Sequence, residues 1–169
     1  MKIQAFLYSG IETINGVIFA KKSTLILYNP ETISNSYMIP DGVENIAPDA
    51  FRGHEELTNI ILPDSLKHIG EDAFRDCKGL VSITLSNGIE QIDCGAFEDC
   101  TNLTSINIPD SVQYIGHDTF DGCHALVEVE YKGKTYNTIL CQSHRGYETR
   151  DLPTDFYNAV NNKNQKEKF

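Results

Sequence analysis

The sequence predicts a solenoid, in which short coils of similar sequence stack along one axis. Two observations lead to this fold class: apolar residues return every 23 positions over four copies, and turn tripeptides recur between them. One coil of this length cannot bury its own apolar face, so neighbouring coils must stack. We therefore expect mostly short β-strands, one short helical turn in each coil, and separate structures at the two ends.

Three apolar columns define the repeat. They are formed by Ile39, Leu62, Leu85 and Ile108, by Phe51, Phe74, Phe97 and Phe120, and by Leu57, Leu80, Leu103 and Leu126. Every step within a column is 23 residues. Side chains of one column therefore occupy the same point of successive coils, and the three columns together predict a continuous core.

Each copy predicts two short strands joined by a turn. In the second copy, Leu57, Ile60 and Leu62 follow the L-x-x-L-x-L pattern of leucine-rich repeats and are expected to point inward. A Pro-Asp-Ser or Pro-Asp-Gly tripeptide then predicts a turn, except in the third copy, which has Ser-Asn-Gly. Second extended segments are expected over 43–46, 66–69, 89–92 and 112–115, and the Ala-Phe pair that follows each is expected on a helical turn.

The repeated pattern Ile-Pro-Asp-Gly-Val-x-x-Ile-x-x-x-Ala-Phe-x-Gly resembles the BspA-like leucine-rich repeat family, a class associated with bacterial surface proteins. The resemblance is strongest over residues 36–130, which hold the four copies. It implies a leucine-rich-repeat solenoid that binds proteins or serves in adhesion and has no enzymatic activity. Because a fold does not determine a function, the partner has to be inferred from the surface.

Residues 1–169 are expected to form a single domain whose two ends depart from the repeat. The N-terminal segment 1–35 predicts an irregular hairpin cap, with strands at Val17–Phe19 and Leu25–Tyr28 and a turn at Lys21–Thr24. The C-terminal segment 131–169 predicts a cap with a hairpin around Gly133 and a short helix over Leu152–Asn161. Phe156, Tyr157 and Val160 of that helix are expected to pack on the final coil, whereas 137–151 is left unassigned and the lysine-rich tail is expected to fray.

Acidic residues are concentrated in the repeats. Residues 36–130 carry 18 Asp and Glu against 4 Lys and Arg, whereas the two flanking segments together carry 6 acidic and 10 basic residues. An acidic block repels phosphate, so nucleic acid and anionic membrane surfaces are not expected partners. The charge fits a solvated surface or a basic partner.

The sequence predicts no membrane insertion, because no apolar run reaches eighteen residues. The first ten residues are too polar for a secretory signal peptide. We therefore expect a cytoplasmic protein if Met1 is the natural start, and a cell-surface or secreted protein if a leader has been removed.

The cysteines can be interpreted as metal ligands or as structural residues. His54, Cys77, Cys100 and Cys123 form one column, but four residues at about 4.8 Å per coil cannot surround one zinc ion. A buried column of reduced thiols is therefore expected, although neighbouring coils are close enough for a disulfide. Cys94 is expected to be partly exposed and the first thiol to react.

No catalytic or metal-binding residues and no cofactor are predicted. Cys141 and His144 could form a metal-binding or catalytic pair, but no second ligand pair and no orienting group accompany them, and an ordinary loop is favoured. The column of Asp41, Asp64, Asn87 and Asp110 could suggest calcium, but turn formation explains it. An enzyme that uses the C-terminal segment remains a remote alternative.

The outward positions of the first strand in each copy are the predicted binding surface for a protein, or for a glycan. They are Thr58, Asn59, Ile61, Val81, Ser82, Thr84, Thr104, Ser105, Asn107, Val127, Glu128 and Glu130. The outward residues of the second extended segments form an acidic, polar alternative surface. A monomer is expected, and the alternative to a binding module is a scaffold protein that self-associates through its ends.

Overall fold

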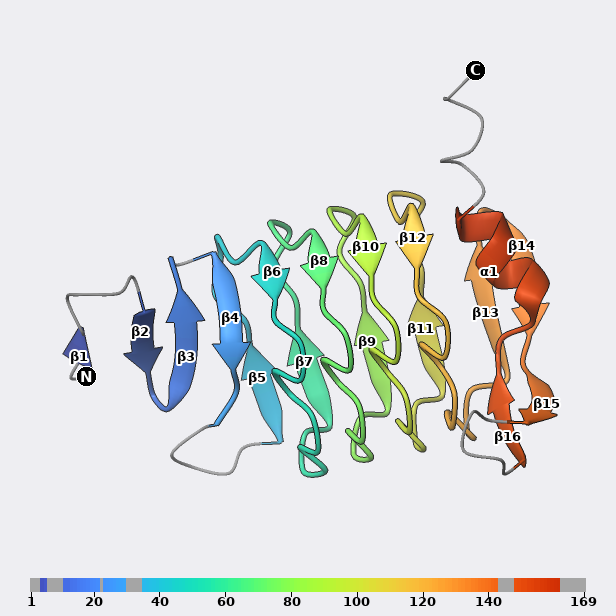
Figure 1. The fold of residues 1–169 in the computed structure, drawn as a ribbon, viewed down its shortest axis with the longest axis horizontal. Coiled ribbons are helices and arrows are strands. Elements are labelled where there is room, and N and C mark those ends of the chain that lie inside the picture. The colour runs from blue at the N-terminus through green and yellow to red at the C-terminus, as the bar shows by residue number, and fades with distance from the viewer. Residues whose placement is uncertain (1–3, 6–10, 22, 30–34, 143–147, 162–169) are drawn as a thin grey trace, which may run out of the picture.

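The protein is a β-solenoid in which the coils lie side by side along the long axis (Figure 1). The structure, a computed structural model, describes residues 4–5, 11–21, 23–29, 35–142 and 148–161. Each regular coil contributes one strand to each of two sheets, so the fold class predicted from the repeat is confirmed.

One sheet has eight strands and runs the length of the molecule. Its order is β1 (Gln4–Ala5), β2 (Ile11–Ile14), β3 (Val17–Ala20), β4 (Thr24–Leu27), β6 (Asn45–Ile46), β8 (His68–Ile69), β10 (Gln91–Ile92) and β12 (Tyr114–Ile115). The strands up to β4 are antiparallel and those from β4 onward are parallel. The parallel strands pair in register through Ile46, Ile69, Ile92 and Ile115. Each of these residues lies beside the one 23 positions away, so the sequence period equals one coil.

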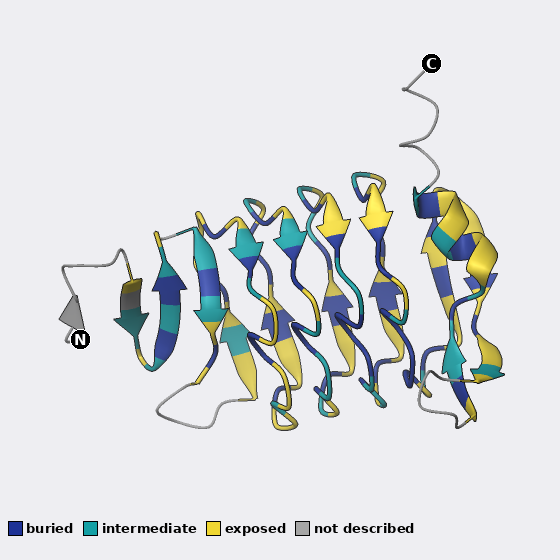
Figure 2. Cartoon of the chain, viewed as in Figure 1, coloured by how far each residue is buried: buried dark blue, intermediate teal, exposed yellow. Residues whose placement is uncertain are grey.

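The second sheet has six strands. They lie in the order β14 (Lys134–Asn137), β13 (Glu128–Tyr131), β11 (Ser105–Asn107), β9 (Ser82–Thr84), β7 (Asn59–Ile61) and β5 (Ser36–Met38). All neighbours are parallel except the β13–β14 hairpin. In β7, β9 and β11 the middle residue is buried and its two neighbours are exposed (Figure 2), as side-chain alternation in a strand requires.

The segments around the Ala-Phe pairs form consecutive tight turns in place of the expected helical turn. Asp72 and Asp76 adopt left-handed backbone conformations, with φ of 53° and 58°, and the same two positions are left-handed in every coil. Left-handed residues four apart interrupt a right-handed helix. The amide groups donate to the next coil instead, as Phe51 N does to Ala73 O at 2.7 Å.

Stacked aromatic rings fill the core along the axis. The ring centroids of Phe51 and Phe74 lie 4.9 Å apart, those of Phe74 and Phe97 5.3 Å, and those of Phe97 and Phe120 5.8 Å. Tyr28 extends the stack at 4.8 Å from Phe51. All five rings are at most 2% exposed, so each coil seals the apolar face of the one before it.

The N-terminal hairpin is continuous with the solenoid. Its strands β3 and β4 occupy the positions that the sequence predicted for a hairpin, and β4 pairs parallel with β6. Tyr28 N donates to Ala50 O at 2.8 Å, the same bond that Phe51 makes to the following coil. The hairpin therefore provides a partial coil on which the first regular coil stacks.

Strand β16 and helix α1 of the C-terminal segment are hydrogen-bonded to the last coil. The unassigned segment forms an antiparallel pair, β15 (Ile139–Gln142) and β16 (Glu148–Asp151), and Gly122 N donates to Arg150 O of β16 at 3.0 Å. Helix α1 (Thr154–Asn161) follows, with Phe156 and Val160 fully buried. The side chain of Asn161 both donates to and accepts from the backbone of Ile115, each at 2.8 Å, at the edge of the eight-stranded sheet.

Candidate functional site

The outer face of the six-stranded sheet holds every residue of the predicted binding surface. We call these twelve residues the sheet face: Thr58, Asn59, Ile61, Val81, Ser82, Thr84, Thr104, Ser105, Asn107, Val127, Glu128 and Glu130. All twelve are exposed. The parallel register aligns them in rows, with Ser82 opposite Ser105 and Asn107 opposite both Thr84 and Glu130. The alternation of the strands thus brings residues of four coils onto one continuous surface.

The sheet face combines short polar side chains with exposed aliphatic ones. Ile61 is 45% exposed, Val81 48% and Val127 61%, and Met38 of the adjoining strand β5 is 65% exposed. A shallow hollow of about 260 Å³ lies between β7 and β9, lined by Asn59, Ile61 and Thr84 among others. A surface that combines exposed aliphatic groups with hydroxyl and amide groups can be buried in a contact with another protein.

Hydrogen bonds between coils hold several of these side chains in place. Thr58 Oγ1 donates to Asn35 O at 3.0 Å, and Thr104 Oγ1 donates to Val81 O at 3.1 Å. Residues held by bonds and by a packed sheet lose little further freedom when they are covered, which favours binding.

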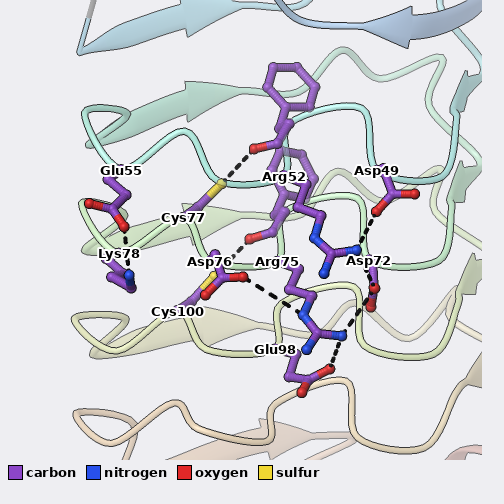
Figure 3. A network of polar contacts seen from close by, with 12 residues as sticks. Asp49, Arg52, Glu55, Asp72, Arg75, Asp76, Cys77, Lys78, Glu98 and Cys100 are labelled. Atoms are coloured by element: carbon purple, nitrogen blue, oxygen red, sulfur yellow. Dashed lines mark hydrogen bonds and ion pairs between the residues drawn. The ribbon is translucent and has the colours of Figure 1, made fainter.

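The turn side of the solenoid carries a network of ion pairs (Figure 3). Arg52 Nη1 lies 2.8 Å from Asp49 Oδ1 and 3.1 Å from Asp72 Oδ2. Arg75 Nη1 lies 3.1 Å from Asp72 Oδ2 and 2.8 Å from Glu98 Oε2. Burial raises the pKa of Glu98 to about 7; Arg75 opposes this effect, and nearby aspartates add to it. Sequence reasoning had not singled out this network, although its signal is visible when each column is followed across the four copies.

The cysteine column is structural. Cys77, Cys100 and Cys123 are fully buried free thiols, and their Sγ–H groups donate to Phe51 O, Phe74 O and Phe97 O at 3.0, 3.1 and 3.1 Å. Burial raises the pKa of the Cys77 thiol to about 12. Cys94, expected to be partly exposed, is half-buried. Among the described residues no three His, Cys, Asp or Glu side chains are placed to hold a metal ion.

The described residues of the C-terminal segment form a hollow but include no activated nucleophile. Cys141 is half-buried on β15, and burial raises the pKa of its thiol, which opposes formation of the thiolate. Its suggested partner His144 lies outside the described residues. A hollow of about 440 Å³ lies between β12, β15 and α1. Beside it, Tyr157 Oη donates to Asp151 Oδ1 at 2.6 Å, and burial raises the pKa of Asp151 to about 6.

The stacked coils and their exposed sheet define the class of protein. A stack of coils with two short strands each, a buried Leu-Phe-Cys interior and an exposed parallel sheet face is a repeat solenoid of the kind that presents a surface for interaction. The model of the BspA type leucine-rich repeat region matches residues 23–140 in six copies, and the chain belongs to this family. Proteins with these repeats are typically interaction or adhesion modules. The match extends beyond the four regular copies, from the start of β4 into β15.

Solved structures of bacterial leucine-rich repeat proteins are similar to the chain. The T. pallidum protein TpLRR is 30% identical with a TM-score of 0.58, and the match covers 75% of this chain and 59% of that one. A leucine-rich cell surface protein of Faecalibacterium prausnitzii is 28% identical with a TM-score of 0.60, covering 74% and 40%. The pneumococcal vaccine antigen PcpA is 28% identical with a TM-score of 0.69, covering 74% and 31%. The chain thus spans about three fifths or less of these relatives.

No curated protein is significantly similar to the chain. Among the described residues, no helix is long and apolar enough to cross a membrane.

Proposed function

We propose that the chain is a non-enzymatic protein-binding module and that the sheet face is its contact surface. One observation carries the proposal: twelve exposed, outward residues from four coils form a continuous surface that includes the aliphatic side chains of Ile61, Val81 and Val127. A rigid parallel sheet presents these groups in fixed positions, so a complementary protein surface can cover them at little entropic cost.

The partner we infer is a protein whose contact surface has larger side chains than the sheet face. Binding hot spots are enriched in Trp, Tyr and Arg, and the sheet face has none of them. Such anchors would therefore come from the partner and pack over the short Ser, Thr and Val side chains. A glycan partner is the alternative occupant of the same surface.

We place this role at the cell surface or outside the cell. Two similar structures are described as a cell surface protein and a vaccine antigen, which supports that location over a cytoplasmic one. A piece of a longer surface protein would also fit the partial coverage of these relatives.

The proposal is tested by charge substitution on the two sheets. The double variant Val81→Arg, Thr104→Arg places two long cations on the sheet face, and the matched double variant Gln91→Arg, Gln113→Arg places the same charges on the exposed side of the other sheet. Proteins captured by the unmodified chain from a mixture of extracellular proteins are identified by mass spectrometry, and the purified candidate is then titrated against all three chains.

We expect the sheet-face variant to weaken direct binding by roughly tenfold or more, about 1.4 kcal/mol, and the matched variant to bind like the unmodified chain. Thermal unfolding must show that both variants remain folded. Equal binding by the two variants would show that the sheet face is not the contact surface. Binding of glycans and of no protein would show that the partner is a glycan.

A further inference from the structure

The six-stranded sheet ends on a strand edge that no described element covers. β14 is the terminal strand of this sheet, and among the described residues no strand pairs with it on the side away from β13 (Figure 1). The eight-stranded sheet ends differently, because Asn161 binds the N–H and the C=O of Ile115 on its edge strand β12. The outer side of β14 is thus an open strand edge at the C-terminal end of the solenoid.

The backbone groups on this edge belong to Thr135 and Asn137. The β13–β14 pair is antiparallel, and its ladder continues into the bond from Thr138 N to Val127 O, which is 2.8 Å long. Bonded and non-bonded pairs alternate in an antiparallel ladder, so Tyr136 is bonded to β13 whereas Thr135 and Asn137 are not. The N–H and C=O groups of Thr135 and Asn137 therefore point away from β13, and both residues are exposed.

β14 lacks the features that usually protect a strand edge. Natural edge strands are protected by proline, by a bulge or by charged side chains. β14 has the sequence Lys-Thr-Tyr-Asn, and its register with β13 is unbroken. Its one charged side chain, Lys134, is paired with Asp155 of α1, with 3.3 Å between Nζ and Oδ2. An extended polypeptide can therefore add to this edge through main-chain hydrogen bonds.

Two carboxylates beside the edge indicate the chemistry of the added strand. Glu130 and Glu128 of β13 lie opposite Thr135 and Asn137 on the sheet face, and neither glutamate forms an ion pair with a described residue. A strand added to β14 would lie about 4.8 Å from it and about twice as far from β13. Lys and Arg side chains are long enough to extend over the short side chains of β14 toward these carboxylates.

We propose that the β14 edge binds an extended segment of a partner protein as an antiparallel strand with Lys or Arg at alternate positions. Main-chain hydrogen bonds to Thr135 and Asn137 hold the segment, and its cations face Glu130 and Glu128. A second copy of the chain fits less well, because its own β14 would place Thr135 and Asn137, and no cation, beside these carboxylates. The proposal rests on the proposed function only in taking a protein as the partner, and it adds a main-chain contact to the sheet face.

The test uses the full chain, labelled with ¹⁵N, and three synthetic peptides of equal charge. The first is acetyl-Lys-Thr-Lys-Thr-Lys-Thr-Lys-amide. The second is N-methylated at its two inner lysines, whose N–H groups would face β14 when the lysine side chains lie on the sheet face. The third is N-methylated at its first and last threonines, whose N–H groups would face away.

The amide resonances of Thr135 and Asn137 report on the edge, and that of Gln91 on the other sheet is the internal control. We expect saturable shifts at Thr135 and Asn137 with the first and third peptides, with a dissociation constant of roughly 1 mM. The second peptide should bind at least about fivefold more weakly. Because these peptides need no natural partner, the result is independent of the outcome at Val81 and Thr104.

Variants of the chain separate the main-chain contact from general acidity. Thr135→Pro removes the outward N–H without breaking a bond to β13, and should weaken the first peptide by roughly fivefold or more, whereas Thr135→Val keeps the N–H and should change binding by less than about twofold. The double variant Glu128→Gln, Glu130→Gln should weaken binding by roughly fivefold. The matched pair Glu44→Gln, Glu90→Gln, at exposed positions beside the other sheet, should change it by less than about twofold.

The proposal is overturned by equal binding of the three peptides, by equal effects of folded Thr135→Pro and Thr135→Val chains, or by no saturable shift at Thr135 and Asn137. Weaker binding of the third peptide than of the second would contradict the antiparallel arrangement. Self-association that Thr135→Pro abolishes, without binding of any peptide, would assign the edge to a second copy of the chain instead.

Discussion

At the scale of single residues, the repeat places most of the chemically versatile side chains in structural positions. The three column cysteines are buried and donate to carbonyl groups of the preceding coil, and burial raises the thiol pKa of Cys123 as it does for Cys77. Asp151, half-buried near the C-terminus, accepts two hydrogen bonds at its Oδ1, from Leu152 N at 2.7 Å and from Tyr157 Oη at 2.6 Å.

The raised pKa of Asp151 predicts that the free energy of unfolding depends on pH. Burial raises its pKa from 3.8 to about 6, and the charges of Asp121 and Asp118 act in the same direction, whereas its two hydrogen bonds oppose the shift. A raised carboxyl pKa means that its contribution to stability is complete below about pH 3.8 and is lost as the pH rises through about 6. Asp151→Asn keeps an acceptor oxygen and removes the buried charge.

We therefore expect Asp151→Asn to raise the free energy of unfolding by roughly 1 kcal/mol at pH 7.5, with the gain disappearing near pH 4. Urea unfolding at the two pH values measures this difference. Glu148→Gln, an exposed change on the same strand, is the control. A stability gain that is the same at both pH values would contradict the assignment to Asp151.

At the scale of elements, strands whose residues alternate between buried and exposed were predictable, and strands without that alternation were not. The two strands of each coil follow directly from the L-x-x-L-x-L pattern and the following Ile. By contrast, β15 has no buried side, because Ile139 is 46% and Leu140 69% exposed, so its sequence gives no periodic signal. The sequence predicts a helical turn around each Ala-Phe pair, where the structure has tight turns. The residue type does not reveal this difference, because an aspartate such as Asp72 can adopt either a left-handed or a helical backbone conformation.

Besides burying Phe156 and Val160, helix α1 places one side chain on the edge of the eight-stranded sheet. Asn161 satisfies both the N–H and the C=O of Ile115, on the edge strand of the eight-stranded sheet. An uncovered strand edge is a template for pairing with another chain. This contact therefore opposes self-association at the C-terminal end, which is one of the two ends that a scaffold role would use.

We expect Asn161→Ala to lower the free energy of unfolding by roughly 1 to 2 kcal/mol, because two backbone groups lose their partner. Asn158→Ala, an exposed change one turn earlier on the same helix, should have an effect below about 0.5 kcal/mol. Urea unfolding gives the stabilities, and light scattering reports whether the opened edge associates. Equal effects of the two substitutions would show that the Asn161 contact does not stabilise the end.

At the scale of the whole molecule, the repeat determines both the core and the outer surface. The same alternation that buries Ile60, Ile83 and Ile106 exposes the residues beside them, so the twelve positions of the sheet face were predictable as exposed. Their use in binding stays a prediction. The ion-pair network of Arg52 and Arg75 was not predictable from single copies, because each arginine pairs with a carboxylate of the following coil.

Whether a partner contacts the sheet face is tested with a pair of photo-crosslinkers. Benzoylphenylalanine replaces Ser82 on the sheet face in one protein and Gln91 on the other sheet in a second, both at exposed positions of the same coil. With a partner that binds the unmodified chain, irradiation should crosslink it through position 82 and leave position 91 unreacted. Crosslinking through position 91 alone would contradict the claim.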